Sequence, residues 1–191
     1  MTFDPIKQMF RWSLRKKGKR VFNICRKYVQ MTALMAGLAL SATAAHAAPE
    51  DGVVTAGSAT ITSSAGNVEI YQSSSRTVIE WGSFDIASGE TVQFFQPGTG
   101  SIALNRITTS GQLTTINGNL LANGKVLVIN PNGVLIGAQG RVDTAGFIAS
   151  AADTDTALFM SGAEKLYFDN AGRADAAVEN RGHITIRDAG L

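Results

Sequence analysis

The sequence predicts an all-β fold wound as a solenoid of short strands, and three observations support this. Nearly every segment after Val53 is a short apolar or alternating run, for example residues 68–71, 91–95 and 183–186. Thr, Val and Ile recur within the runs and suit pleated strands, whereas Gly, Asn or Ser separates one run from the next. A short pattern also recurs, in which Asn-Gly or Gly is followed by one residue and then by apolar residues. Its copies are irregularly spaced, which is typical of solenoid rungs with loops of variable length.

Two other β folds remain open at this level. A sandwich would show alternating strands at a spacing of about 8–12 residues. Hairpins would need two-residue type I′ or II′ turns, which Asn117-Gly118 or Asn123-Gly124 would supply. Helical periodicity is scarce, and its best candidate, Ala163 to Phe168, is short.

Residues 1–47 predict a cleaved signal peptide, which leaves residues 48–191 as the mature domain. A long basic region precedes the apolar stretch Met31 to Ala44, and the A-x-A cleavage motif formed by Ala45 and Ala47 stands directly before Ala48. The apolar stretch is shorter than the roughly 20 residues of a membrane span. A membrane anchor or an amphipathic helix is the alternative, which the flanking features disfavour.

The charge of the mature domain differs from that of the whole chain. Of 17 basic and 15 acidic residues, nine basic and one acidic residue lie in residues 1–47, so the mature domain keeps eight basic and 14 acidic residues. This net charge of about −6 excludes the broad basic surface of a nucleic-acid-binding domain. The only cysteine, Cys25, lies in the predicted signal, so the mature domain cannot rely on disulfides.

Residues 125–137 predict a strand, a tight turn and a second strand. In Asn130-Pro131-Asn132-Gly133, Pro at the second position and Gly at the fourth suit a type I turn. Along the first strand, Val126 and Val128 share one face, and Leu127 and Ile129 share the other. Because both faces are apolar, we expect one to line the core and an extra segment to cover the other.

Other side chains point to packing rather than to chemistry. His183 is the only histidine of the mature domain and is expected to face solvent, and Asp153-Thr154-Asp155 is a weak Ca²⁺ candidate that we interpret as a solvated loop. No catalytic residue, metal site or cofactor is predicted. Four aromatic side chains are expected in the core or in a cap: Trp81, Phe84, Phe94 and Phe95.

The last residues predict a further turn and strand between Val178 and Ile186, and the sequence then stops at Leu191 without a capping element. An open solenoid end is an exposed strand edge. We therefore expect the chain to be the N-terminal piece of a longer protein, with the solenoid continuing beyond residue 191.

Five short motifs follow one another in a specific order between Val53 and Ser150. They are Trp81 to Ile86, Val92 to Pro97, Ala103 to Ile107, Ile116 to Gly124, and Val128 to Gly137 leading into Ala145 to Ser150. Their order and spacing resemble the N-terminal secretion (haemagglutination activity) domain of filamentous-haemagglutinin-type exoproteins, the two-partner secretion family of Gram-negative bacteria. The segment Val142 to Gly146 departs from that family's pattern, which leaves its local turn open.

The resemblance implies a right-handed parallel β-helix with no enzymatic chemistry. It implies export by the Sec translocase and recognition in the periplasm by docking domains of a cognate outer-membrane β-barrel transporter. The β-helix then nucleates folding at the cell surface, and downstream regions of the adhesin-like protein contact host-cell or bacterial receptors. The family's signature regions contain Asn105 and Asn130 to Gly133. We expect these residues to shape the fold, Asn105 by capping a turn or by forming a ladder with another Asn inside the coil.

Two other functions stay open. A polysaccharide-cleaving β-helix enzyme would need clustered carboxylates on one face, whereas Glu69, Glu80, Asp85 and Asp143 are scattered among loops with no shared spacing. An autotransporter passenger would carry its own C-terminal barrel. The downstream reading frame distinguishes these possibilities from two-partner secretion.

Overall fold

The computed structural model describes residues 48–109 and 111–187. The predicted signal, with Ala45 and Ala47 of the cleavage motif, lies outside the described residues, whereas Ala48 lies inside them and packs against the core. Within the described part of the chain, no helix is long and apolar enough to cross a membrane.

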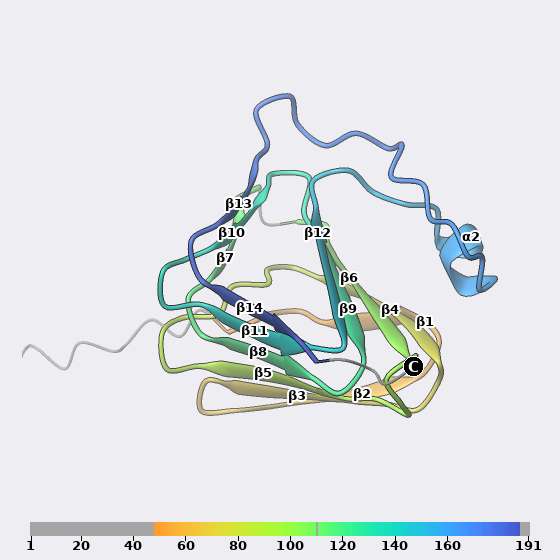
Figure 1. Cartoon of the computed structure of the whole chain (residues 1–191), viewed down its shortest axis with the longest axis horizontal. Helices are drawn as coiled ribbons and strands as arrows, with labels where there is room; N and C mark the ends of the chain where they lie inside the picture. Colours follow the sequence, from red (N-terminus) through yellow and green to blue (C-terminus); the bar gives the residue numbers. More distant parts are fainter. Residues whose placement is uncertain (1–47, 110, 188–191) are drawn as a thin grey trace, which may run out of the picture. The chain divides into compact units, whose positions relative to one another are not determined.

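Three β-sheets enclose the core of a parallel β-solenoid of about three turns (Figure 1). The five-stranded sheet contains β1 (Val53–Ala56), β4 (Arg76–Trp81), β6 (Ile102–Ile107), β9 (Lys125–Ile129) and β12 (Gly146–Ser150). The three-stranded sheet contains β7 (Thr114–Ile116), β10 (Val134–Ile136) and β13 (Val178–Asn180). The six-stranded sheet contains β2 (Ala59–Ser64), β3 (Asn67–Gln72), β5 (Thr91–Phe95), β8 (Asn119–Ala122), β11 (Arg141–Thr144) and β14 (His183–Ile186).

Successive rungs stack in parallel and in register. The chain passes through the six-stranded, five-stranded and three-stranded sheets in turn, for example as β5, β6 and β7, and then repeats the path as β8, β9 and β10. Ile79, Asn105 and Val128 therefore occupy one column of the five-stranded sheet. The solenoid prediction is confirmed, and the sandwich and hairpin alternatives are wrong for these rungs.

Two antiparallel strands close the N-terminal end of the solenoid. β1 pairs with β4, and β2 pairs with β3 across a two-residue turn in which Ala65 and Gly66 both have positive φ (45° and 83°). This turn has the φ signs of a type I′ hairpin. Asn117-Gly118 and Asn123-Gly124, the pairs considered for hairpins, instead form corners between consecutive parallel strands of the solenoid.

The predicted two-sided strand is confirmed. Val126 and Val128 of β9 are fully buried in the solenoid core, whereas Leu127 and Ile129 belong to a second apolar cluster on the outer face of the five-stranded sheet. Residues 151–177, which we name the strap, leave the solenoid after β12 and supply buried Phe159 to this outer cluster. An extra segment thus covers the outer apolar face, as expected.

The only helix among the described residues, α2 (Thr156–Met160), lies in the strap at the edge of the fold in Figure 1. Residues 163–168, the short best candidate for helical periodicity in the sequence, are not helical, and the helix lies earlier, after its N-cap at Asp155. Asp155 is the N-cap, and its carboxylate accepts a hydrogen bond from the N–H of Leu158. The carboxylate thereby satisfies a backbone donor that the first turn leaves free.

Most of the aromatic prediction holds, with one exception. Trp81, Phe84 and Phe94 are buried, and the ring centroids of Trp81 and Phe84 lie 5.3 Å apart in an edge-on contact. Phe95 is 42% exposed, so its placement in the core or cap was wrong. Side chains alternate along a strand, so buried Phe94 directs Phe95 outward, where it stacks on Tyr71 at 4.8 Å.

The last rung is open to solvent. The side chains of β13 and β14 are exposed, including Val178 and Ile184, which stand in register with the buried core residues Val134 and Val142. His183 is exposed on the outer face, as expected.

We predict that Phe159→Ala lowers the free energy of unfolding by about 3 kcal/mol, because it removes a fully buried ring from the outer cluster. Urea denaturation measures this change. The control is Tyr167→Ala, which truncates a 60% exposed aromatic of the same strap and should cost less than about 1 kcal/mol. Equal losses from the two variants would show that the strap is not anchored by burial of Phe159.

Candidate functional site

The predicted signature residues Asn130 to Gly133, named here the signature corner, connect β9 to β10. The N–H of Gly133 donates to the carbonyl of Asn130 at 2.9 Å and closes the turn. The side-chain Oδ1 of Asn130 accepts two hydrogen bonds from Asn132, one from the backbone N–H at 2.9 Å and one from the side-chain Nδ2 at 3.1 Å. The amide of Asn130 therefore organises the turn that follows it.

The Asn130 side chain also joins two rungs. Its Nδ2 donates to the carbonyl of Gln112 at 2.9 Å and to the hydroxyl of Thr114 at 3.0 Å, both at the start of β7 in the preceding rung. Asn130 is only 1% exposed, so these bonds satisfy a buried amide. This position requires a short side chain with a donor and an acceptor, which explains Asn.

The far side of the signature corner contacts the strap. Gly133 has a φ of +109°, and a Cβ added there would lie 2.5 Å from the carbonyl oxygen of Ala177. The carbonyl of Pro131 accepts the N–H of Arg173 at 2.9 Å. Asn130 and Gly133 are buried, and Pro131 and Asn132 are half-buried. The folded corner is thus enclosed by its neighbours in sequence and in space.

Asn105 lies inside the coil, fully buried in β6. Its Oδ1 accepts the indole N–H of Trp81 at 3.0 Å, and its Nδ2 donates to the carbonyl of Leu127 at 3.1 Å. Asn105 thus links the rungs before and after its own. Neither expectation for Asn105 holds, since it lies within a strand and caps no turn, and its in-register neighbours are Ile79 and Val128, so no Asn is placed to form a ladder with it.

Asp85 holds β7 from the side opposite to Asn130. Its Oδ1 accepts the backbone N–H of Thr115 at 2.6 Å, one rung later in the coil. Burial raises the pKa of the Asp85 carboxyl above its ordinary value, and the hydrogen bond from Thr115 opposes this increase. Asp85 and Asn130 therefore fix β7 from the preceding and the following rung.

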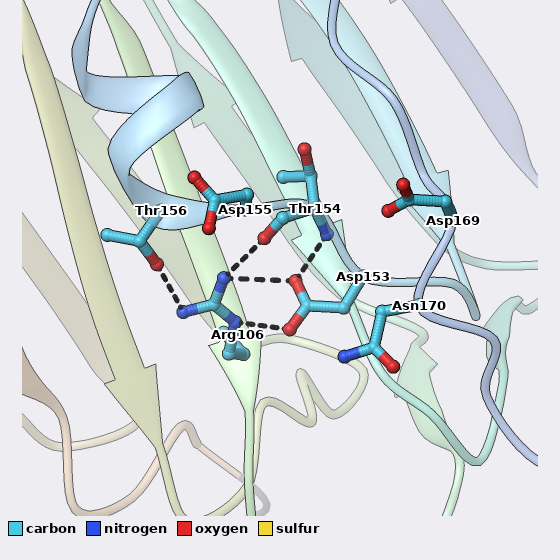
Figure 2. A pocket seen from close by; sticks show the side chains of 7 residues that line it. All are labelled: Arg106, Asp153, Thr154, Asp155, Thr156, Asp169 and Asn170. Carbon is cyan, nitrogen blue, oxygen red and sulfur yellow. Dashed lines mark hydrogen bonds and ion pairs between the residues drawn. The ribbon is translucent and has the colours of Figure 1, made fainter.

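Arg106 is the centre of the most connected polar group on the outer face (Figure 2). Its side chain is 14% exposed, and its Nε and Nη2 contact the two carboxylate oxygens of Asp153 at 2.8 and 3.0 Å. Nη2 also donates to the carbonyl of Thr154 at 3.0 Å, and Nη1 donates to the hydroxyl of Thr156 at 3.1 Å. Arg106 thus fastens the beginning of the strap to β6.

Arg76 fastens the other end of α2. Its Nη1 donates to the carbonyl of Phe159 at 2.8 Å, and its guanidinium lies 5.2 Å from the centroid of the Phe159 ring. Sequence reasoning assigned no role to either arginine. The alternation of β6 places Arg106 on the same face as Leu104, but its partner is 47 residues away in sequence, so no local pattern indicates the pair.

The interpretation of Asp153 to Asp155 as a solvated loop was wrong. Asp153 is ion-paired with Arg106, Thr154 is 3% exposed, and Asp155 caps α2. The depression around them, about 440 Å³, is shown in Figure 2. Across the described residues, no group of three or more His, Cys, Asp or Glu side chains is arranged to hold a metal ion.

The acidic residues weighed for catalysis lie in separate places. Glu69 accepts a hydrogen bond from Tyr71, Glu80 lies near Arg106, Asp85 binds the backbone of Thr115, and Asp143 pairs with an arginine after β14. The fold does not bring them together as a general acid and base pair would require.

We predict that Asn130→Ala lowers the free energy of unfolding by about 3 kcal/mol, because buried partners in two rungs lose their hydrogen bonds. Asn132→Ala is the matched control, since it removes one side-chain bond at a half-buried position and keeps its backbone bond to Asn130. Urea denaturation of both variants measures the difference. Equal stability of the two variants would contradict the role of Asn130 in joining rungs.

We predict that Asp85→Asn changes the pH dependence of stability. The pKa of the Asp85 carboxyl is raised in the folded state above its unfolded value of about 3.8. Between these two pKa values, the folded state therefore binds more protons at Asp85 than the unfolded state does. Asp85 therefore makes stability fall as pH rises from that value through its folded pKa. Urea unfolding between pH 4 and 7 should show the stability difference, variant minus wild type, increasing with pH; a constant difference would contradict the effect of burial.

The comparisons with known proteins agree with this architecture. The family model described as TPS secretion domain matches residues 45–188. The crystal structure of the HMW1 secretion domain from Haemophilus influenzae superposes with a TM-score of 0.64 at 32% sequence identity, covering 71% of this chain and 36% of that chain.

Two sequence relatives extend the comparison. A heme/hemopexin-binding protein of Haemophilus influenzae is 38% identical over 107 residues, which is 56% of this chain and 12% of the relative. A second Haemophilus influenzae protein of that name is 40% identical over 91 residues, 48% of this chain and 10% of the relative. The matched part is thus about a tenth of the length of each relative.

Exoproteins with such a domain are exported across the periplasm and are secreted or associated with the cell surface, and a cognate outer-membrane transporter is the partner that the domain implies. The family is known by secretion rather than by catalysis. On the match across residues 45–188 and the shared solenoid fold, the chain belongs to the TPS secretion domain family and is the secretion domain of a two-partner secreted exoprotein.

Proposed function

We propose that residues 48–191 are recognised in the periplasm by docking domains of the cognate transporter, cross the outer membrane unfolded, and nucleate β-solenoid folding at the cell surface. The observation that carries this proposal is the asymmetry of the coil. Antiparallel strands close its first rung, whereas each later rung adds in parallel to the one before. Once the first rung forms, folding can propagate in one direction along the chain.

Vectorial folding accounts for transport without an added energy source in this domain. Each rung that forms outside buries apolar side chains such as Val92, Leu120 and Val142. Reversal of transport would re-expose these side chains to water, which is unfavourable. The growing solenoid thus opposes backward movement of the chain.

The signature residues serve the fold in this proposal. The side chains of Asn105 and Asn130 form hydrogen bonds with residues of neighbouring rungs, and Gly133 lies against Ala177. Only Pro131 and Asn132 keep partly accessible surface. A transporter that contacts the folded domain would therefore meet little of the signature corner.

The leader and the downstream region complete the pathway. Residues 1–47 direct the chain to the Sec translocase and are cleaved after Ala47, so that the mature domain begins at Ala48. Packing of Ala48 against the core supports a boundary at this residue. Downstream regions of the exoprotein carry its surface activity and any contact with receptors, and the secretion domain itself carries out no catalysis.

We predict that the chain, co-expressed with its transporter, reaches the medium or the cell surface, and that Asn132→Ala does so at wild-type yield. Asn130→Ala should reach it at several-fold lower yield, because it weakens the junction between later rungs through which folding propagates. Immunoblots of periplasmic and external fractions measure this distribution.

Two outcomes would contradict the proposal. Periplasmic retention of the wild-type chain beside a functional transporter would exclude two-partner recognition of this domain. Retention of an Asn132→Ala chain with wild-type stability would show that the corner is a recognition epitope, and the purely structural assignment of the signature residues would be wrong.

A further inference from the structure

The outer face of the six-stranded sheet carries a depression of about 360 Å³ that the secretion function leaves unused. Its lining comes from β8, β11 and β14, which lie side by side in Figure 1, and from the residue that follows β14. Val142 points into the core, so its neighbours Arg141 and Asp143 point outward. The residues that matter for binding are Asn119, Leu121, Arg141, Asp143, His183 and Arg187.

Parallel stacking arranges these side chains in columns. Asn119, Arg141 and His183 stand in one column, in register across three strands. Leu121 and Asp143 stand in the next column. Neighbouring strands are about 4.8 Å apart, so polar side chains and one apolar side chain present a closely spaced, fixed array.

The cationic groups of this depression differ in their bonding. Arg187 donates from Nε and Nη2 to the two carboxylate oxygens of Asp143, which neutralises that pair. Arg141 and His183 are exposed, and within residues 48–109 and 111–187 neither side chain has a hydrogen bond or an ion pair. An unpaired guanidinium therefore stands beside an unpaired imidazole in a domain whose net charge is negative.

We propose that this depression binds an acidic sugar through its carboxylate. The planar guanidinium of Arg141 matches a carboxylate in a bidentate pair, and His183 adds a neighbouring donor. Leu121 supports the apolar face of the sugar ring. Asn119 and the pair formed by Asp143 and Arg187 bind hydroxyl groups, because an amide and an ion pair offer both donors and acceptors.

The uncovered state of this sheet supports a surface ligand. The strap covers the outer face of the five-stranded sheet, whereas the six-stranded sheet leaves the stacked pair Tyr71 and Phe95 at 47% and 42% exposure. These rings lie on β3 and β5 and do not line the depression, whose own apolar surface comes from Leu121 and can face the apolar C–H side of a sugar ring.

The test titrates the secreted chain with tetragalacturonate and with its methyl ester, which has the same size but no negative charge. Isothermal titration calorimetry should show binding of the acid and at least tenfold weaker binding of the ester. Arg141→Gln should weaken acid binding about tenfold or more, since it removes a charge-assisted pair. Lys165→Gln is the control, because it removes one exposed positive charge from the strap and should leave binding unchanged.

Three outcomes would overturn the assignment. The first is no binding of tetragalacturonate, and the second is an equal effect of Arg141→Gln and Lys165→Gln, which would indicate only general electrostatics. The third is binding of an acidic hexapeptide as tight as that of tetragalacturonate, which would show that the depression recognises charge without recognising a sugar. Circular dichroism confirms that each variant is folded, and secretion yield is measured separately because this site is independent of export.

Discussion

In-register stacking of parallel rungs is the constraint on which the rest of this structure depends. Neighbouring strands must lie about 4.8 Å apart along the whole coil, including the corners, where the backbone turns and cannot pair continuously. Added Cβ atoms at Gly118 and Gly124 would lie 2.3 and 2.7 Å from carbonyl oxygens of the preceding rung. Buried amides at Asn105 and Asn130 donate to backbone carbonyls of neighbouring rungs. Glycines at the corners, and short buried amides that bond from rung to rung, are therefore consequences of rung spacing.

The outer face of the five-stranded sheet is also apolar and needs a covering layer. A sheet with apolar side chains on both faces needs two layers of cover, and the coil supplies only the inner one. The strap supplies the outer one, with Phe159 in the apolar cluster and with Arg76 and Arg106 binding the strap at two points. The ion pair of Arg106 and Asp153 is mostly buried, so its importance lies in positioning the strap as much as in net stability.

Secretion fits this design because the coil has a closed first rung, to which the later rungs add in parallel. Antiparallel β1 and β2 cover the first rung at the N-terminal end of the coil. In the proposed pathway growth is directional, and Asn105 and Asn130 contribute by bonding neighbouring rungs. The outer face of the six-stranded sheet is free of this task and is available for a surface ligand.

Local patterns in the sequence determined the strands, the corner at Asn130 to Gly133 and the two-sided character of β9, because alternation and turn chemistry act over a few residues. They also indicated that an extra segment covers one of the two apolar faces of β9. Only the tertiary structure decided which face is covered and by what, and it placed a helix at 156–160, exposed Phe95 and paired Arg106 with Asp153. These features depend on residues that are tens of positions apart in sequence. Stacking of the rungs brings such residues together, and the local spacing of apolar residues carries no information about them.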